Sequence, residues 1–395
     1  MEKKLAILPT IENISDDLNL IFKDLHMHPE LGFQEFRTSK IVKEKLREYG
    51  VDELHTEIGK TGIVAIINGN QEGPKRVGVR ADMDALPLNE NNTFEYSSKF
   101  PGKMHACGHD GHITMLLGAA KYLATKKNFN GTVNFIFQPA EEGLGGADKM
   151  IKDGLFKKFP MKSVYGLHNW PGMPAGHFGI GKGAVMAAAD FFDLEIIGVG
   201  GHAAMPDNCI DPIVLTAQVI SALQSISSRE TNPLDSVVIS ITQIHSGDAY
   251  NIIPDSVKMN GTVRSFNKDI RKKLPESMLR IINGICEAFG AKCKLKYING
   301  YPATINSDKE TEISRNVAKD IVGKEKIFDN PTPSMVTEDF SYMLQKLPGC
   351  YIWLGTGNSK GITPCLHSSN FDFNDNVLTI GAAYWIKLVE KELSI

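Results

Sequence analysis

A nine-residue segment, MHACGHDGH at residues 104–112, holds a thiol and an imidazole at a spacing that suits metal binding. Cys107 and His109 are separated by a single glycine, so both side chains can reach one metal centre. We expect the segment to lie just before a helix, whose positive end lowers the pKa of a nearby thiol and so favours the metal-binding thiolate. The chemistry that such a site provides is the activation of water by a divalent cation.

Four other segments carry carboxylates or histidines where a predicted strand ends or a loop begins. Residues 76–81, 133–137 and 164–167 read as strands, and each runs directly into polar side chains. Ligands of an open parallel sheet bind at the carboxyl ends of its strands, so we expect these side chains to meet at one edge. The side chains concerned are Asp82 and Asp84, Glu141 and Glu142, His168 and, in a loop before the last helix, His367.

Each of these features by itself has an ordinary structural explanation. A lone histidine at a strand end is usually a hydrogen-bonded structural residue, and adjacent glutamates are usually solvated. We likewise assign His26 and His28, at a predicted helix end, to structural roles. The joint occurrence of a Cys-Gly-His, a Glu-Glu and a His at element boundaries is what predicts a metal site.

Other enzyme signatures are weak in this sequence. It contains neither HExxH nor GxSxG. Residues 198–203 match GxGxxA after a predicted strand, but Pro206 and a polar segment stand before the next helix. We therefore give little weight to dinucleotide binding.

The elements that must position these residues alternate along the first part of the chain. We predict helices at residues 35–49 and from Asp110 onward, with a further strand at 62–67. After Asn299 the same pattern resumes, with a helix at 310–322, a strand at 350–354 and a helix at 377–392. Strands that alternate with helices predict an α/β fold, a mostly parallel sheet with helices on both faces.

The middle of the chain has another order of elements. Strands are predicted at 190–197, 236–245, 257–266 and 292–297, and helices at 211–228 and 270–289. The first helix opens on Asp211-Pro212, an acidic cap followed by proline. This order is that of a ferredoxin-like α+β unit. We therefore predict a discontinuous catalytic domain (1–183 and 299–395) and an inserted lid or dimerisation domain (184–298).

The bulk composition agrees with a globular, two-domain protein. The chain has 395 residues, 42% hydrophobic and 23% charged, with a formal net charge of −3. This charge gives no reason to expect nucleic acid or a membrane surface as a partner. The six cysteines are scattered, and no signal peptide or membrane span is evident, so we expect a cytoplasmic protein with reduced thiols.

At these residues the sequence resembles the metallopeptidase and aminoacylase family. It is most similar to the amidohydrolase branch, with its hippurate hydrolases, N-acyl-amino-acid amidohydrolases and indole-acetyl-amino-acid hydrolases. The matching segments follow one another in family order through nearly the whole chain: LHMHPELG (25–32), RADMDALP (80–87), MHACGHDGH (104–112), QPAEEG (138–143), GLHNWP (166–171), GGHAAMP (200–206), NIIP (251–254), EDF (338–340) and LH (366–367).

The resemblance implies a site and a reaction. It implies that Glu141 is the general base, and that the lid makes a homodimer or tetramer in which a lid histidine reaches the partner's site. It implies that His202, Asn251 and Arg264 bind the substrate carboxylate or the oxyanion. Two divalent ions would be held by Cys107, His109, Glu142, His168 and His367.

This sequence departs from the wider family at Asp82, where most members have a metal-binding histidine. We expect Cys107 and His109 to fill that gap, and Asp84 to support the ligands from behind. Thiolate and imidazole suit zinc, cobalt or nickel, and the carboxylate also admits manganese. With two divalent ions and a hydroxide, the centre keeps a positive charge of about one unit, which favours an anionic transition state.

We therefore expect a metal-dependent amidohydrolase that cleaves N-acyl amino acids into a carboxylic acid and a free amino acid. The same site would also serve a metallo-dipeptidase or carboxypeptidase, and only the shape of the acyl pocket separates the two. A catalytically silent metal-binding protein is a further alternative. The intact Glu141 beside every expected ligand argues against it.

Overall fold

The computed structural model describes residues 11, 13–357 and 364–394. The chain divides into two compact units. Unit 1 comprises Met1–Val185, Ile305–Thr332 and Asp339–Ile395. Unit 2 comprises Met186–Thr304 and Pro333–Glu338.

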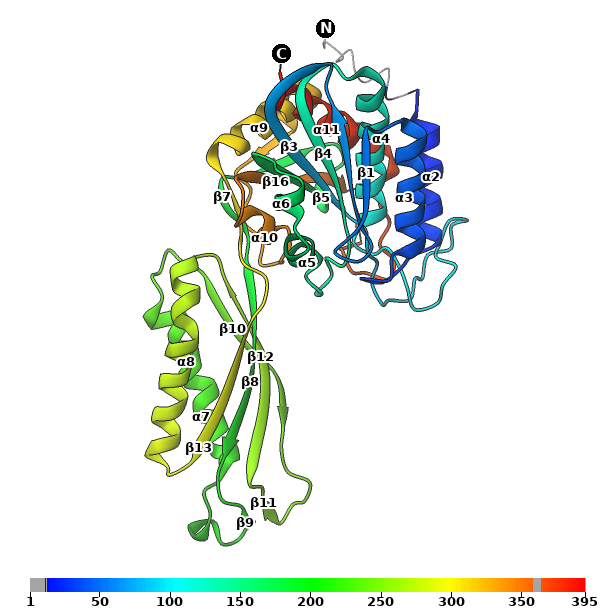
Figure 1. Ribbon diagram of the computed structural model, residues 1–395. Helices are drawn as coiled ribbons and strands as arrows, with labels where there is room; N and C mark the ends of the chain where they lie inside the picture. Colours follow the sequence, from blue (N-terminus) through cyan, green and yellow to red (C-terminus); the bar gives the residue numbers. More distant parts are fainter. Residues whose placement is uncertain (1–10, 12, 358–363, 395) are drawn as a thin grey trace. The chain divides into compact units, whose positions relative to one another are not determined.

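An eight-stranded sheet forms the centre of unit 1 (Figure 1). Its strand order is β1-β2-β4-β3-β5-β16-β6-β15, and the four neighbours β4, β3, β5 and β16 run parallel. The sheet is mostly parallel, as predicted. Its strands are β1 (Glu53–Ile58), β2 (Gly62–Asn68), β3 (Gln71–Asp82), β4 (Asn130–Gln138), β5 (Ser163–Pro174), β6 (Phe178–Ile180), β15 (Ile327–Asp329) and β16 (Gly349–Gly357).

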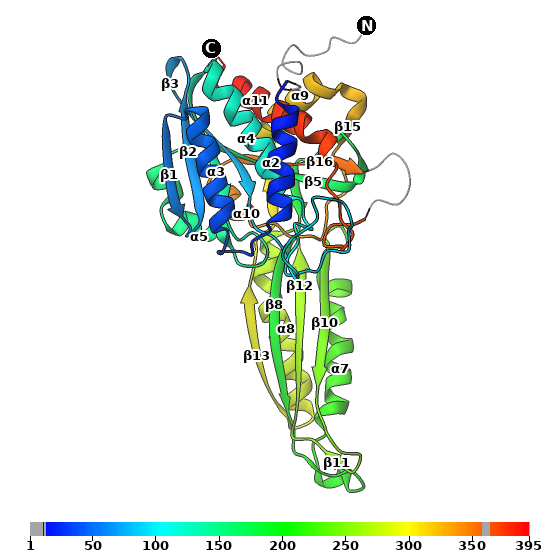
Figure 2. The same ribbon diagram turned by 90° about the vertical axis from the view of Figure 1, so that its right-hand side faces the viewer.

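Helices cover this sheet on both sides (Figures 1 and 2). The central one is α4 (His109–Lys126), which packs against β3 and against its neighbours α2, α3 and α11. Most of its residues are buried, since it is apolar on nearly every side, as expected of a core helix. The other helices of the unit are α2 (Ser15–Met27), α3 (Phe36–Tyr49), α5 (Gly146–Lys152), α6 (Leu155–Lys158), α9 (Asp308–Val322), α10 (Ser341–Leu344) and α11 (Leu378–Glu392).

The predicted strands and helices of unit 1 are present. However, β3 begins five residues before the predicted strand 76–81, and β5 continues seven residues past the predicted strand 164–167. His168 therefore lies within β5 and not after its end. The strand β1 was not predicted, because its sequence ELHTEI lacks an apolar alternation and most of its residues are partly or fully exposed. It forms the edge of the sheet, where polar side chains are expected. Two short strands, β7 (Gly183–Met186) and β14 (Thr304–Asn306), pair separately.

Unit 2 is a four-stranded antiparallel sheet with two helices, and its order of elements is the predicted one (Figure 2). The strands lie in the order β10-β12-β8-β13, which is the ferredoxin-like arrangement. Along β8 and β12 buried residues alternate with more exposed ones, so one face packs on the helices. The elements are β8 (Ala188–Ile197), β9 (Gly201–His202), α7 (Pro212–Ser225), β10 (Val237–His245), β11 (Ile252–Ile253), β12 (Ser256–Ser265), α8 (Lys268–Ala288) and β13 (Lys292–Asn299).

The start of α7 follows the sequence signal closely. Asp211 caps the helix by accepting the backbone N–H groups of Ile213 and Val214, and Pro212 occupies the first turn. The regular helix ends at Ser225, three residues before the predicted end, and continues as a wider turn over Ile226–Glu230. Serine hydroxyls in this region hydrogen-bond back to the helix carbonyls, which favours a local change of pitch.

The segment that matches GxGxxA leads into the short strand β9, which pairs with β11. A three-residue 3-10 helix, Pro206–Asn208, follows β9, and the next α-helix of the described residues begins at Pro212. This segment therefore lacks the strand-turn-helix geometry of a dinucleotide site. Among the helices of the described residues, none combines the length and apolar character that a bilayer span requires.

Candidate metal centre

The carboxyl edge of the unit 1 sheet collects the polar segments that the sequence places at strand ends. Strand β3 ends at Asp82, which lies opposite Gln138, the last residue of β4. On the other side of β3, Arg80 lies opposite Gly166 of β5, so His168 stands level with Asp82. Neighbouring parallel strands therefore deliver their side chains to one edge.

The predicted ligands come together at this edge. The ligand atoms of Cys107, His109 and His168 all lie within 4.8 Å of one another, and so do those of Cys107, Glu142 and His367. Cys107 Sγ is 3.4 Å from His168 Nε2. His367 Nε2 is 3.2 Å from Glu142 Oε1. Five side chains from four distant segments of the chain thus form one cluster.

Two of the histidines are oriented by hydrogen bonds to backbone carbonyls. His109 Nδ1 donates to the carbonyl of Asp84 at 2.8 Å, and His168 Nδ1 donates to that of Asn169 at 2.7 Å. A carbonyl can only accept, so each Nδ1 carries the proton and each Nε2 presents a lone pair to the cluster. This is the tautomer that a metal-binding histidine needs.

The donor set fits a metal ion. Within the described residues, His109 Nε2 and Glu142 Oε1 are buried and make no hydrogen bond, although His367 Nε2 lies 3.2 Å from Glu142 Oε1. Buried polar atoms are rarely left unpaired, because desolvation without a partner is unfavourable. A divalent cation would satisfy both atoms, together with the thiolate of Cys107.

The pKa of Cys107 corrects one expectation. We expected the helix end to lower it, but burial and the nearby carboxylates of Glu142, Glu141 and Asp82 hold it well above its usual range. Desolvation and like charge outweigh the helix dipole here. The thiolate therefore needs the positive charge of a cation in the cluster.

Burial and the nearby charge of His112 hold the pKa of His168 well below its usual range, which keeps the imidazole neutral. Burial also opposes the charging of His109, but Asp82 and Asp84 outweigh it and raise the pKa of His109 to about 10. A metal ion would take the place of the additional proton on His109 Nε2.

Asp84, whose partner the sequence does not identify, holds the turn that carries the two glutamates. Its two carboxylate oxygens accept the backbone N–H groups of Glu141 at 2.9 Å and Glu142 at 3.0 Å. The preceding residue, Ala140, has a φ of +53°, in the left-handed region. The direction of both glutamates therefore depends on this turn.

Sequence reasoning missed a buried network behind the cluster. The Asp82 carboxylate accepts a hydrogen bond from His112 Nδ1 at 2.6 Å and one from Arg80 at 2.7 Å. Arg80 also donates to Gln138 at 2.8 Å and to Asp339 at 3.1 Å. His112 and Asp339 both lie in segments that resemble the family, but only their long-range partners reveal this role.

The predicted substrate-binding residues of unit 2 fall into two groups. His202 on β9 pairs with Ile252, next to Asn251, and both His202 and Asn251 are exposed. Arg264 lies near the other end of β12, opposite Ala189, the second residue of β8. Because β8 has ten residues, the two groups lie about 30 Å apart. Unit 2 therefore does not bring all three residues together.

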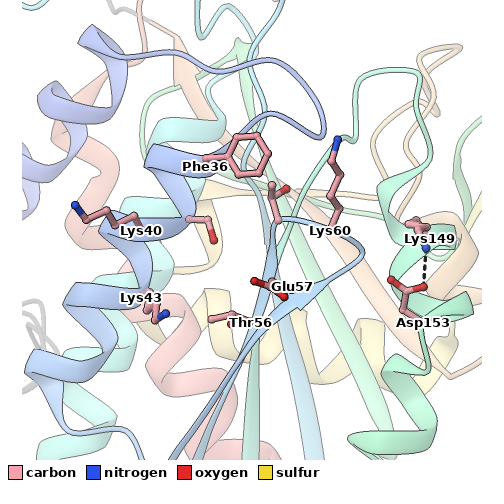
Figure 3. A pocket seen from close by; sticks show the side chains of 10 residues that line it. Phe36, Lys40, Lys43, Thr56, Glu57, Lys60, Lys149 and Asp153 are labelled. Atoms are coloured by element: carbon pink, nitrogen blue, oxygen red, sulfur yellow. Dashed lines mark hydrogen bonds and ion pairs between the residues drawn. The ribbon is translucent and has the colours of Figure 1, made fainter.

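A surface pocket of about 690 Å³ lies elsewhere in unit 1 (Figure 3). Ten residues line it, and none of them is a predicted site residue. They include Phe36, Lys40, Lys60, Thr61 and Asp153. The ammonium groups of Lys40 and Lys60 point in different directions in Figure 3, so these lysines do not converge on one anion.

A cluster of one thiol, three imidazoles and two carboxylates, buried except at Glu142 and His367, lies at the carboxyl edge of an α/β sheet and defines a metal-dependent hydrolase. The chain belongs to peptidase family M20/M25/M40, whose family model matches residues 78–391. This family membership identifies the protein as a metal-dependent amidohydrolase or peptidase.

Individual relatives cover almost the whole chain. A hippurate hydrolase of Campylobacter jejuni is 43% identical over 388 residues, which cover 98% of this chain and 99% of the relative. A thermostable carboxypeptidase of Saccharolobus solfataricus is 42% identical over 378 residues, 94% of each chain. The crystal structure of a Bacillus subtilis peptidase, described as binding a dinuclear metal, matches with a TM-score of 0.85 and 33% identity over 97% of this chain and 99% of that one.

Proposed function

We propose that this protein hydrolyses the amide bond of N-acyl amino acids, releasing a carboxylic acid and a free amino acid. The observation that carries the proposal is the position of Glu141. The residue is 7% exposed, and a carboxylate oxygen lies within 4.8 Å of the ligand atoms of His109 and Glu142. A carboxylate at the edge of a metal cluster can take a proton from the attacking water.

The residues proposed to hold two divalent ions are Cys107, His109, Glu142, His168 and His367. When bound, such ions polarise the amide carbonyl and lower the pKa of water. Zinc and manganese are the metals we propose first, and cobalt and nickel are compatible with the same donors. The mixture of one thiolate, imidazoles and a carboxylate supports this choice.

The adjacent glutamates are proposed to have different roles, Glu142 as a metal ligand and Glu141 as the general base. Glu142 faces His367 at 3.2 Å and serves as a ligand. Glu141 accepts the backbone N–H of Asp339 at 3.2 Å, which orients its carboxylate. In this role Glu141 removes the proton from water and returns it to the leaving amine.

The proposed substrate carries an acyl group on an amino acid whose carboxylate remains free. Hippurate, the substrate named for the Campylobacter relative, is such a compound. Arg264 is a suitable partner for the carboxylate, since a guanidinium can bind it in a bidentate manner. His202 and Asn251 are proposed to contact the carbonyl or the developing oxyanion.

The geometry of unit 2 supports a homodimer as the working form. One small substrate cannot bridge the distance between Arg264 and the His202–Asn251 pair of the same sheet. We therefore propose that the His202 and Arg264 that serve one substrate come from different subunits, so that the partner subunit's His202 completes each site.

A comparison of substrates tests the function. The protein, reconstituted with zinc or manganese, is assayed on hippurate, an N-acetyl amino acid and a dipeptide, before and after chelation. The proposal requires the two N-acyl amino acids to have the higher kcat/KM, and chelation to abolish turnover.

A preference for the dipeptide would favour the alternative, a metallo-dipeptidase or carboxypeptidase. The similarity to the Saccharolobus carboxypeptidase supports this alternative. If none of the three substrates is turned over by the metal-loaded protein, the proposed function is wrong.

A further inference from the structure

Glu35, the residue before α3, is a fully buried carboxylate outside the metal cluster. Both of its oxygens accept hydrogen bonds from neutral donors. Oε2 accepts the hydroxyl of Thr61 at 2.6 Å, and Oε1 accepts the backbone N–H of Ala140 at 2.8 Å. Neither of these two contacts brings a cation to the carboxylate. A buried acidic group without a cation is unfavourable, so its presence calls for a specific reason.

The contact with Ala140 is informative because of where Ala140 stands. It directly precedes Glu141, and its φ of +53° is disfavoured for a residue with a Cβ. Its N–H is held by Glu35, and its carbonyl accepts the N–H of Gly146 at 2.9 Å. Both backbone polar groups of the strained residue are therefore fixed.

The N–H groups of three consecutive residues in this turn go to two buried carboxylates. Glu35 accepts the N–H of Ala140, and Asp84 accepts those of Glu141 and Glu142. Burial and the nearby charge of Asp84 raise the pKa of Glu35 to about 7. The neutral form of Glu35 is thus well tolerated. The feature that matters for the turn is an oxygen that accepts the Ala140 N–H at a fixed distance.

Building on the role proposed above for Glu141, we propose that Glu35 is a positioning residue for that general base. It holds Ala140 in the left-handed conformation, and so sets the direction of the next side chain. Thr61, at the end of the β1–β2 turn, holds the Glu35 carboxylate in place from the opposite side. Misplacement of a reacting group by about 1 Å lowers turnover strongly.

The order of three variants separates a geometric role from a charge role. Glu35→Gln keeps the side-chain length, because its amide oxygen accepts the Ala140 N–H and its NH₂ donates to Thr61. Glu35→Asp keeps the charge but is one methylene too short, and Glu35→Ala removes the acceptor. We expect Glu35→Gln to stay close to wild-type kcat, and Glu35→Asp and Glu35→Ala to lose about tenfold or more, with little change in KM.

The measurements use the metal-loaded protein, with kcat, KM, bound metal per subunit and the thermal midpoint recorded for each variant. Bound metal should stay close to the wild-type level, because Asp84, and not Glu35, holds the backbone N–H of the ligand Glu142. Glu30→Gln is the matched control. Glu30 lies five residues earlier and accepts the N–H groups of Arg37 and Thr38, so it caps the same helix without contacting Ala140. It should lower the thermal midpoint and leave kcat unchanged.

A double variant distinguishes failure of this inference from failure of the proposed function. If Glu35 acts through Glu141, Glu35→Asp should cause no further loss of kcat in a Glu141→Gln background. Independent, multiplying losses of kcat, or a kcat of Glu35→Asp above that of Glu35→Gln, would overturn the positioning role. Should Glu141→Gln itself keep normal kcat, the general-base assignment fails first. If Glu35→Ala does not fold, Glu35→Gln and Glu35→Asp still decide the question.

Discussion

Asp84 and Glu141 are joined by a 2.9 Å hydrogen bond, in which the backbone N–H of Glu141 donates to Oδ1 of Asp84. The second oxygen of Asp84 takes the N–H of Glu142 at 3.0 Å. One buried carboxylate therefore sets the backbone of both the proposed base and a proposed ligand. Asp84 also orients His109, whose Nδ1 donates to the Asp84 backbone carbonyl.

Replacing Asp84 with asparagine should weaken metal binding. The NH₂ of asparagine would face a backbone N–H, so one of the two hydrogen bonds becomes a repulsive contact. Loss of such a supporting contact typically lowers metal affinity by about 10- to 100-fold. Competition with a chromogenic chelator measures the effect, and Asp17→Asn, on the surface of the same unit, serves as the control. An unchanged affinity in Asp84→Asn would contradict the role.

The two adjacent glutamates should fail in different ways. Glu141→Gln should retain bound metal but lose about a hundredfold or more in kcat, the usual scale for a general base. Glu142→Gln should instead lose metal, as measured by elemental analysis. A metal-replete Glu141→Gln protein with nearly normal kcat would show that another group accepts the proton.

Substitution of Cys107 should change metal content where that of another buried cysteine does not. Cys107→Ser should reduce the metal bound per subunit or weaken its affinity more than about tenfold, because a hydroxyl replaces the thiolate. Cys350 on β16 is also fully buried, and Cys350→Ser provides the matched control. If both variants bind metal like the wild type, Cys107 is not a ligand.

Stability should depend on pH through His26. Burial disfavours its charge, but hydrogen bonds with Asp110 at 2.6 Å and Glu90 at 3.2 Å outweigh this and raise the pKa of His26 to about 10. The folded state thus binds a proton that the unfolded state releases above its ordinary pKa of 6.5. The stabilisation is complete below pH 6.5 and declines toward pH 10, by at most about 1.4 kcal/mol per pH unit.

Urea unfolding of the metal-free wild type and of metal-free His26→Gln, at several pH values between 6.5 and 10, measures this effect. The difference in unfolding free energy between the two proteins should shrink as the pH rises. A difference that is constant, or that grows with pH, would contradict an ion pair at His26.

Mixing two inactive variants tests the proposed dimer. In a mixed dimer of Glu141→Gln and His202→Ala chains, one site would combine an intact Glu141 with the partner subunit's His202. Activity should therefore reappear on mixing. Mixing Glu141→Gln chains with chains that carry both substitutions should restore nothing, and a protein that stays monomeric at assay concentration would exclude the arrangement.

The sequence by itself determined the order of elements and the type of chemistry. Alternating strand and helix patterns predict the parallel sheet, and Asp211-Pro212 predicts the start of α7, because these signals act within a few residues. The Cys-Gly-His spacing and the Glu-Glu pair at strand ends predict a metal site for the same reason. A strand with no apolar alternation, β1, escapes this reasoning because an edge position tolerates polar residues.

Only the tertiary structure decided how the groups of the site act on one another. That Asp84 and Glu35 hold the turn at residues 140–142 depends on hydrogen bonds between distant segments, which no local pattern encodes. The raised pKa of Cys107 comes from burial and from carboxylates that folding brings near it, against the local effect of the helix end. The separation of Arg264 from His202 likewise follows from the register of β12 on β8. Desolvation and long-range contacts exist only once the chain has folded, and they set these properties.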